Sequence, residues 1–328
     1  MDTYPQNTRD FERRFCDNEA CLRYIFDLRW PDGYQCPYCG SHGTFWQRKG
    51  LAKIRCGKCR HDYSITSGTI FQDSHISIQT WFRVMWHICL QKNGISALGI
   101  QRSLGLPSYQ TAWLCLHKLR KAMIRQGRNR LSGKVEVDEA YIGGVREGKR
   151  GRGADGKQIV FFAVENKDMI VDGKKRLSIG RIRLLCIPNV TAESLLAAVE
   201  ETVETGSHII TDGLKSYAKL KQKGYAHTVL VDSKQTANTP FGESTYVADD
   251  SKLPKVHLVV SLLKRWILGT FQGSVGKDHL QDYLNEFTFR FNRRASHSRG
   301  MLFWRLAQMA VTYEPTTKNE LFVSRHHI

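Results

Sequence analysis

The sequence has no long apolar run. It contains no stretch of about 18 or more uncharged apolar residues, so we expect no transmembrane helix. Residues 1–14 carry charges of both signs and lack the apolar core of a secretory signal peptide. These absences argue against a membrane or secreted protein, and we expect a cytoplasmic location.

Acidic residues are scarce relative to basic ones. The 328 residues include 31 Asp and Glu against 49 Lys and Arg, which gives a formal net charge of +18 at pH 7. Such a balance favours a polyanionic partner, most often nucleic acid, although a basic protein without such a partner is the alternative. Hydrophobic residues, at 41%, suffice for packed cores. The length predicts two or three modules.

Disulfides are not expected, because a reducing compartment keeps thiols free and paired cysteines there indicate metal binding. Four of the nine cysteines form two Cys-x-x-Cys pairs on tight turns, with Gly40 and Gly57 beside them. The pairs are Cys36 with Cys39 and Cys56 with Cys59. This spacing predicts a structural zinc (Zn²⁺) ribbon that folds on binding its metal, whereas two chance redox-type pairs are the alternative.

The remaining cysteines stand singly in apolar or helical contexts. We expect them to be core thiols rather than metal ligands. They are Cys16, Cys21, Cys89, Cys115 and Cys186.

The ribbon is expected over 31–70, after a helical lead-in at 1–30. A closed four-thiolate site has no open coordination position, so its function is contact rather than catalysis. Basic residues such as Arg55 and Lys58 are interleaved with aromatic ones such as Trp46. This mixture suits a phosphate backbone, and a solvated charged face is the alternative.

A helical pattern follows from residue 76 to about 130. The first helix has one apolar stripe at spacings of three and four residues, formed by Trp81, Val84, Met85, Ile88 and Cys89. A short helix over 96–104, a turn at 105–107 and a third helix capped by Ser108 come next.

This order of short helix, glycine-containing turn and longer helix predicts a helix-turn-helix DNA-binding segment. Helical hairpins of other function share the same order. The polar face of the third helix would read the major groove through basic residues that include Lys118, Arg120 and Lys121.

Strand periodicity begins at residue 133. Strands are expected over 134–142, 159–164, 181–187 and 207–211, with an amphipathic helix over 191–202 before the last strand. This order predicts a mixed α/β sheet. The segment 146–157 is rich in Gly, Arg and Lys, and it predicts a mobile basic loop.

Two acids lie on these strands. Asp138 is in the first strand and Asp212 follows the fourth, so adjacent strands could place both at one edge of the sheet. Carboxylates so placed can share divalent cations, and a pair of ions can activate a hydroxyl and stabilise the leaving oxygen of a phosphodiester. Either acid alone could equally be a solvated or capping residue.

The order of these motifs resembles a known family. The chain has a zinc ribbon, then Val-Asp138-Glu-Ala-Tyr-Ile-Gly-Gly, Thr-Asp212-Gly, and the runs at 263–270 and 283–294. Together they resemble bacterial insertion-sequence transposases that pair an N-terminal zinc ribbon with a ribonuclease-H-like, DDE-type catalytic domain. The resemblance covers about residues 15–312, places the catalytic domain at 133–312 and leaves 313–328 as a tail.

The resemblance implies metal-dependent hydrolysis at the element ends, followed by joining of the 3′ ends to target DNA. It implies double-stranded DNA as partner, a homodimer or larger synaptic assembly, and Mg²⁺ or Mn²⁺ as catalytic metal. In a bacterium the site of action would be the nucleoid.

The third metal position departs from the family pattern of Glu or Asn with a Lys seven residues later. Counting back from Lys264 gives His257, whose imidazole would favour Mn²⁺ relative to Mg²⁺ more than a carboxylate does. Asp138, Asp212, His257 and Lys264 are therefore the candidate catalytic residues. Glu243 is the alternative third ligand, and His257 could instead make only structural bonds.

Further basic residues close the chain. Lys264, Arg265, Arg293 and Arg294 are expected to contact DNA, with solvated surface charge as the alternative. Two other functions remain open. One is a DNA-binding regulator with an inactive catalytic domain, and the other is a nuclease that does not transpose.

Overall fold

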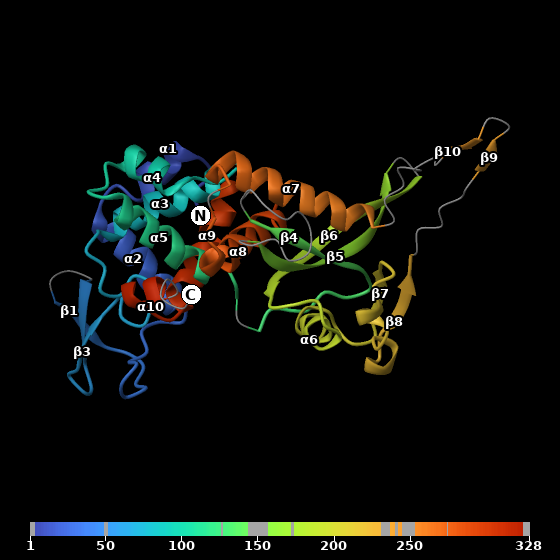
Figure 1. The fold of residues 1–328 in the computed structure, drawn as a ribbon. Helices are drawn as coiled ribbons and strands as arrows, with labels where there is room; N and C mark the ends of the chain where they lie inside the picture. Colours follow the sequence, from blue (N-terminus) through green and yellow to red (C-terminus); the bar gives the residue numbers. More distant parts are fainter. Residues whose placement is uncertain are drawn as a thin grey trace. The chain divides into compact units, whose positions relative to one another are not determined.

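The chain forms two compact units, seen in the computed structural model of Figure 1. The structure describes residues 4–48, 52–125, 127–143, 157–171, 174–230, 237–239, 242–244, 253–273 and 275–323. The first unit comprises Met1–Gly127 and Arg293–Ile328, and the second comprises Arg128–Asn292. Residues 293–312, assigned from sequence to the catalytic domain, thus lie in the first unit.

The core of the first unit is helical. Its helices α1 (Thr8–Arg14), α2 (Asn18–Arg29) and α3 (Ile78–Leu90) surround α9 (Arg299–Thr312). Phe303 of α9 packs edge-on against Phe11 and Phe82, with ring centroids 5.5 and 5.4 Å apart. This packing explains why the C-terminal segment belongs to the first unit.

The apolar stripe expected on α3 is buried as a whole. The two helices that follow also begin where the serines predict. Ser96 caps α4 (Ala97–Leu104), and Ser108 caps α5 (Tyr109–Ala122). Gly105 ends α4 in the left-handed region, with φ of 60°, which lets the chain turn sharply between the helices.

The ribbon forms a three-stranded antiparallel sheet. Its strands are β1 (Phe45–Arg48), β2 (Lys53–Cys56) and β3 (Asp62–Ser64), in that order. The segment 313–328, expected to be a tail, contains α10 (Lys318–Val323), which packs on α5.

The second unit is built on a five-stranded mixed sheet. Its strands are β4 (Lys134–Ile142), β5 (Gln158–Val171), β6 (Lys174–Ile187), β7 (His208–Thr211) and β8 (Ala226–Val229). They lie in the order β6-β5-β4-β7-β8. Neighbours among β4, β5 and β6 run antiparallel, whereas β7 runs parallel to both β4 and β8.

Helices cover both faces of this sheet (Figure 1). Helix α6 (Ala192–Thr202) packs on one face, and α7 (Pro254–Phe271) and α8 (Leu280–Phe291) pack on the other. Alternate residues of β4 explain the two cores, since Val135 and Val137 face α6 while Ile142 faces α7. This arrangement confirms the predicted ribonuclease-H-like α/β fold.

Short elements complete the second unit. The 3-10 helices η2 (Lys215–Tyr217) and η3 (Lys221–Lys223) follow β7, and η4 (Lys277–His279) precedes α8. The strands β9 (Ala237–Thr239) and β10 (Gly242–Ser244) pair antiparallel, and Glu243 lies in β10.

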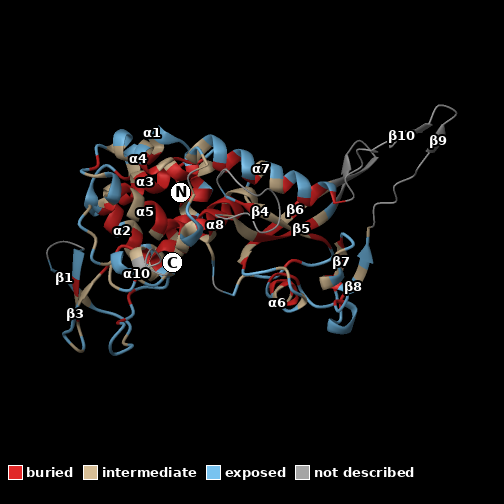
Figure 2. Ribbon diagram, viewed as in Figure 1, coloured by how far each residue is buried: buried red, intermediate tan, exposed pale blue. Residues whose placement is uncertain are grey.

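Burial alternates along the helices that pack on the sheet (Figure 2). In α7 the side toward the sheet is buried and the opposite side is exposed, as expected for an amphipathic helix. Within the described part of the chain, no helix has the length and apolar character needed to span a membrane. Apart from Lys157, the predicted basic loop at 146–157 lies outside the described residues.

Candidate functional site

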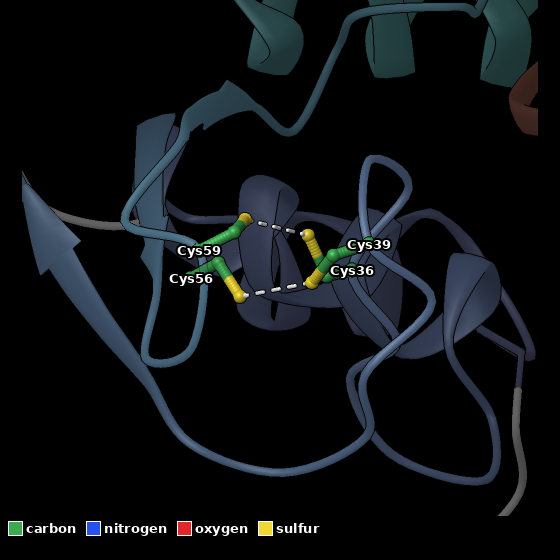
Figure 3. Close-up of side chains that lie close together, drawn as sticks. All are labelled: Cys36, Cys39, Cys56 and Cys59. Carbon is green, nitrogen blue, oxygen red and sulfur yellow. Dashed lines mark hydrogen bonds between the residues drawn. The ribbon is translucent and has the colours of Figure 1, made fainter.

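The side chains of the four paired cysteines point toward one another in the ribbon (Figure 3). The Sγ atoms of Cys36 and Cys59 are 3.7 Å apart, and those of Cys39 and Cys56 are 3.8 Å apart. Sulfurs placed tetrahedrally about 2.3 Å from one zinc ion would be separated by about 3.8 Å. The observed spacing therefore matches a closed, structural Zn²⁺ site.

Local hydrogen bonds favour the thiolate form of Cys39 and Cys56. The Ser41 hydroxyl lies 3.1 Å from the Sγ of Cys39 and 3.5 Å from that of Cys56, and it lowers the pKa of both thiols. The Lys58 amide also donates to Cys56 Sγ, at 3.4 Å. Because zinc binds thiolates, these donors prepare the site for the metal.

The second site begins with the pairing of β4 and β7. Their parallel register aligns Glu136 with Ile210, so Asp138 and Asp212 both lie two residues beyond the same pair. Side chains two residues apart on a strand point to the same face. The register thus places both acids at one level, on the face of the sheet that α7 covers.

Asp138 is half-buried and Asp212 is exposed. Burial raises the pKa of Asp138 and the nearby Asp212 carboxylate raises it further, while the Glu139 amide and His257 act in the opposite direction. The Glu139 amide donates to Asp138 Oδ1 at 2.8 Å. Burial together with a second acid is an arrangement by which functional sites shift the pKa of a carboxyl.

Helix α7 brings His257 to this pair. The Nε2 atom of His257 lies 3.3 Å from Asp138 Oδ2. His257, Ser261, Lys264 and Leu268 share the exposed face of α7, as expected from their spacing. Lys264 is two turns further along, about 10 Å from His257 along the helix axis.

Two family models match the chain. The ISXO2-like transposase domain matches residues 130–292, and the transposase zinc-ribbon domain matches residues 16–62, so together they cover well over half of the chain. The chain belongs to the ISXO2-like transposases.

The transposase also has a relative in an archaeon. It is 24% identical over 297 residues to a Halobacterium salinarum protein described as an uncharacterized protein in transposable element ISH50. The match covers 85% of this chain and 92% of the relative.

Two contacts of the transposase site were not foreseen from the sequence. Glu136 of β4 accepts hydrogen bonds from the first turn of α7, and Glu139 accepts one of 3.1 Å from the Tyr217 hydroxyl. Burial and then the charges of Glu139, Asp138 and Asp212 raise the Tyr217 pKa well above its usual value. The sequence feature that could have indicated the first contact is Glu136 itself, because a charged residue between Val135 and Val137 on a buried strand needs a polar partner.

The residues expected to contact DNA differ in exposure. Lys58, Lys264, Arg265 and Arg294 are exposed, whereas Lys118, Lys121 and Arg293 are half-buried. Arg55 is half-buried and pairs with Asp62, its Nε lying 2.7 Å from Oδ1.

Arg120 was predicted to contact DNA from the polar face of α5, and the structure contradicts this prediction. It is 1% exposed, and its Nη1 lies 3.2 Å from His117 Nε2. Arg120 follows Leu116 by four residues and precedes Met123 by three, so it lies on the buried stripe of α5. Because Arg120 does not face solvent, it is not placed to contact DNA.

The single cysteines mostly follow expectation. Cys21, Cys89 and Cys115 are buried and Cys186 is half-buried. Cys16 is exposed, so its prediction as a core thiol is wrong. It lies just past the end of α1, between the buried Phe15 and the cap of α2.

Proposed function

We propose that this transposase binds the terminal inverted repeats of its element, cleaves at the ends by metal-dependent hydrolysis and joins the 3′ ends to target DNA. The observation that carries the proposal is the shared level of Asp138 and Asp212, with His257 3.3 Å from Asp138. The family match supports phosphoryl transfer as the class of chemistry.

The donor set fits a hard divalent cation. Asp138 and Asp212 offer carboxylate oxygens and His257 offers an imidazole nitrogen, which Mg²⁺ and more so Mn²⁺ accept. When bound, such ions activate a hydroxyl and stabilise the leaving oxygen of a phosphodiester. Glu243 stays an alternative third ligand, because its side chain lies outside the described residues.

Basic residues on α7 would hold the DNA. Lys264 and Arg265 are exposed on α7, on and beside the face that carries His257. They would bind the phosphates that flank the reacting one and offset the repulsion between DNA and the carboxylates. Arg293 and Arg294, in the first unit, would also contact DNA.

The first unit would supply recognition of the element ends. Helices α4 and α5 have the lengths and the turn of a helix-turn-helix, and Lys118 and Lys121 remain as candidate contacts of α5. Lys58 of the ribbon is exposed and would bind the backbone. Synapsis of two element ends requires at least two catalytic centres, so we expect a homodimer or larger assembly.

Cleavage and joining of labelled terminal DNA by the purified chain, with Mg²⁺ or Mn²⁺, test the proposal. Asp138→Asn and Asp212→Asn should each reduce cleavage by at least 100-fold, because they remove a charged donor at the reacting phosphate. Glu200→Gln, at a surface pair with Lys223, is the matched control and should retain activity. Full cleavage by both Asp variants would refute the site.

The same assay separates the alternatives. A regulator with a dead catalytic domain would bind the ends without cutting, and His257→Glu would then create activity absent from the wild type. A nuclease that does not transpose would cut unrelated DNA as well as the element ends and would join neither.

A further inference from the structure

Glu136 is a buried acid outside the proposed metal ligands. Its side chain is 5% exposed, and its Oε2 accepts hydrogen bonds of 3.0 Å from the amides of both Lys255 and Val256. Its Oε1 accepts a 3.1 Å hydrogen bond from Asn166 Nδ2 and lies 3.7 Å from Lys255 Nζ. One strand residue therefore binds the beginning of α7.

These bonds supply a cap that α7 lacks locally. The N-cap residue is Leu253, which has no side-chain cap, and Pro254 has no amide hydrogen to donate. The next two amides, of Lys255 and Val256, both donate to Glu136. A carboxylate at this position also interacts favourably with the positive end of the helix dipole.

The capping contact joins the two elements that carry Asp138 and His257. Asp138 is two residues beyond Glu136 on the same face of β4, and His257 directly follows Val256 on α7. The His257 amide closes the first helical turn by donating to the Leu253 carbonyl at 3.0 Å. Fixing the amides of Lys255 and Val256 against β4 thus fixes the height and rotation of His257 above Asp138.

We propose that Glu136 is a positioning residue that sets His257 against Asp138 by capping α7 from β4. This inference rests on the proposed metal role of His257, while the capping contact itself does not. Glu136 need not touch metal or DNA, because its effect passes through the backbone of α7.

Two substitutions in the full-length protein separate the effect of the length of the Glu136 side chain from the effect of its charge. Glu136→Gln keeps an oxygen at the same reach and loses the charge. Glu136→Asp keeps the charge but is one methylene too short to reach both amides. Glu165→Gln and Glu165→Asp are matched controls, because Glu165 is equally buried on β5 and binds Arg181 and the Ser132 amide instead of α7.

Hydrogen exchange at the Lys255 to Leu258 amides and Mn²⁺ binding, followed by electron paramagnetic resonance, are the readouts. Glu136→Asp should speed exchange there and weaken Mn²⁺ binding about tenfold or more, as loss of a residue that orients a ligand does. Glu136→Gln, which keeps an acceptor for the two amides, should change both less than Glu136→Asp does. The Glu165 variants should change neither.

The inference is overturned if Glu136→Asp and Glu165→Asp destabilise the protein equally and neither alters Mn²⁺ affinity. If Glu136→Asp does not fold, Asn166→Ala removes a donor to Oε1. Faster exchange at the Lys255 to Leu258 amides with unchanged Mn²⁺ affinity in that variant is equally contrary. Failure of the proposed function gives a different pattern: Mn²⁺ binding would be insensitive to Asp138→Asn, while faster exchange in Glu136→Asp would still establish the cap.

Discussion

At the scale of single residues, the zinc ribbon depends on a glycine without room for a side chain. A Cβ atom on Gly57 would lie 2.7 Å from the Thr44 carbonyl oxygen and closer still to the Thr44 hydroxyl. The Gly57 amide donates to that same carbonyl at 2.9 Å. At this position, the turn between Cys56 and Cys59 therefore has room for glycine but not for a residue with a side chain.

Gly57→Ala should weaken zinc binding, because the Cys56 turn must move away from Thr44 and the four sulfurs lose their spacing. We expect at least a tenfold loss in zinc affinity, measured by competition with a chromophoric chelator. Gly269→Ala, where a Cβ meets open space on α7, is the control. Unchanged zinc affinity in Gly57→Ala would contradict the close contact.

Arg120 and Glu136 mark the limits of reading single residues from sequence. The basic character of Arg120 suggested solvent exposure, yet its helical phase placed it on the buried stripe. The α7 amides that Glu136 binds lie more than a hundred residues away, so no local pattern could name them. Cysteine spacing and the Ser108 cap act locally, and both were predictable.

At the scale of elements, a second buried acid joins the strands. Glu165 of β5 binds the guanidinium and amide of Arg181 on β6, and the Ser132 amide before β4. Burial acts to raise the pKa of Glu165, but the bonds from Arg181 outweigh it, so its pKa lies below the usual value. A Cβ on Gly180 would lie 3.1 Å from Glu165 Cβ, so β6 carries glycine beside it.

Acidification should remove this stabilisation. Because the pKa of Glu165 is lowered on folding, its contribution is complete above about pH 4.3, the usual glutamate value, and is lost as pH falls through the lower folded value. Glu165→Gln should cost roughly 1–3 kcal/mol at pH 7 and progressively less below pH 4. Urea unfolding at several pH values measures the difference.

The control for this pH dependence is Glu200→Gln, which removes a half-exposed pair with Lys223. Its effect should be small at every pH. A constant difference between wild type and Glu165→Gln from pH 7 to pH 3 would exclude a lowered pKa.

A strand could be predicted from the sequence where its apolar and polar residues alternate with burial. Strand β4 was delimited correctly because its alternating apolar residues form two cores. Strand β8 was missed because its residues are mostly exposed and leave no alternation to read. The strands β5 and β6 extend beyond their predicted apolar parts, where they pair with each other.

At the scale of the whole chain, the formal net charge is +18, and both units contain basic residues expected to contact DNA. DNA binding should therefore weaken steeply with salt, because each contacted phosphate releases counterions. Lys264→Ala with Arg265→Ala should reduce the slope of log affinity against log salt by about two, measured by fluorescence anisotropy. An unchanged slope would exclude α7 from the DNA interface.

The register of β4 has a consequence for the exposure of the two acids. Strand β5 pairs with β4 along its full length, from Lys134 to Ile142, whereas β7 pairs with it only as far as Glu136. In the described part of the chain, β4 thus continues past Asp138 paired with β5 on one edge and with no strand on the other edge. The sheet thus has a step at the acids, with Asp138 within β4 and Asp212 just past the end of the shorter β7. The step explains why Asp138 is half-buried whereas Asp212 is exposed.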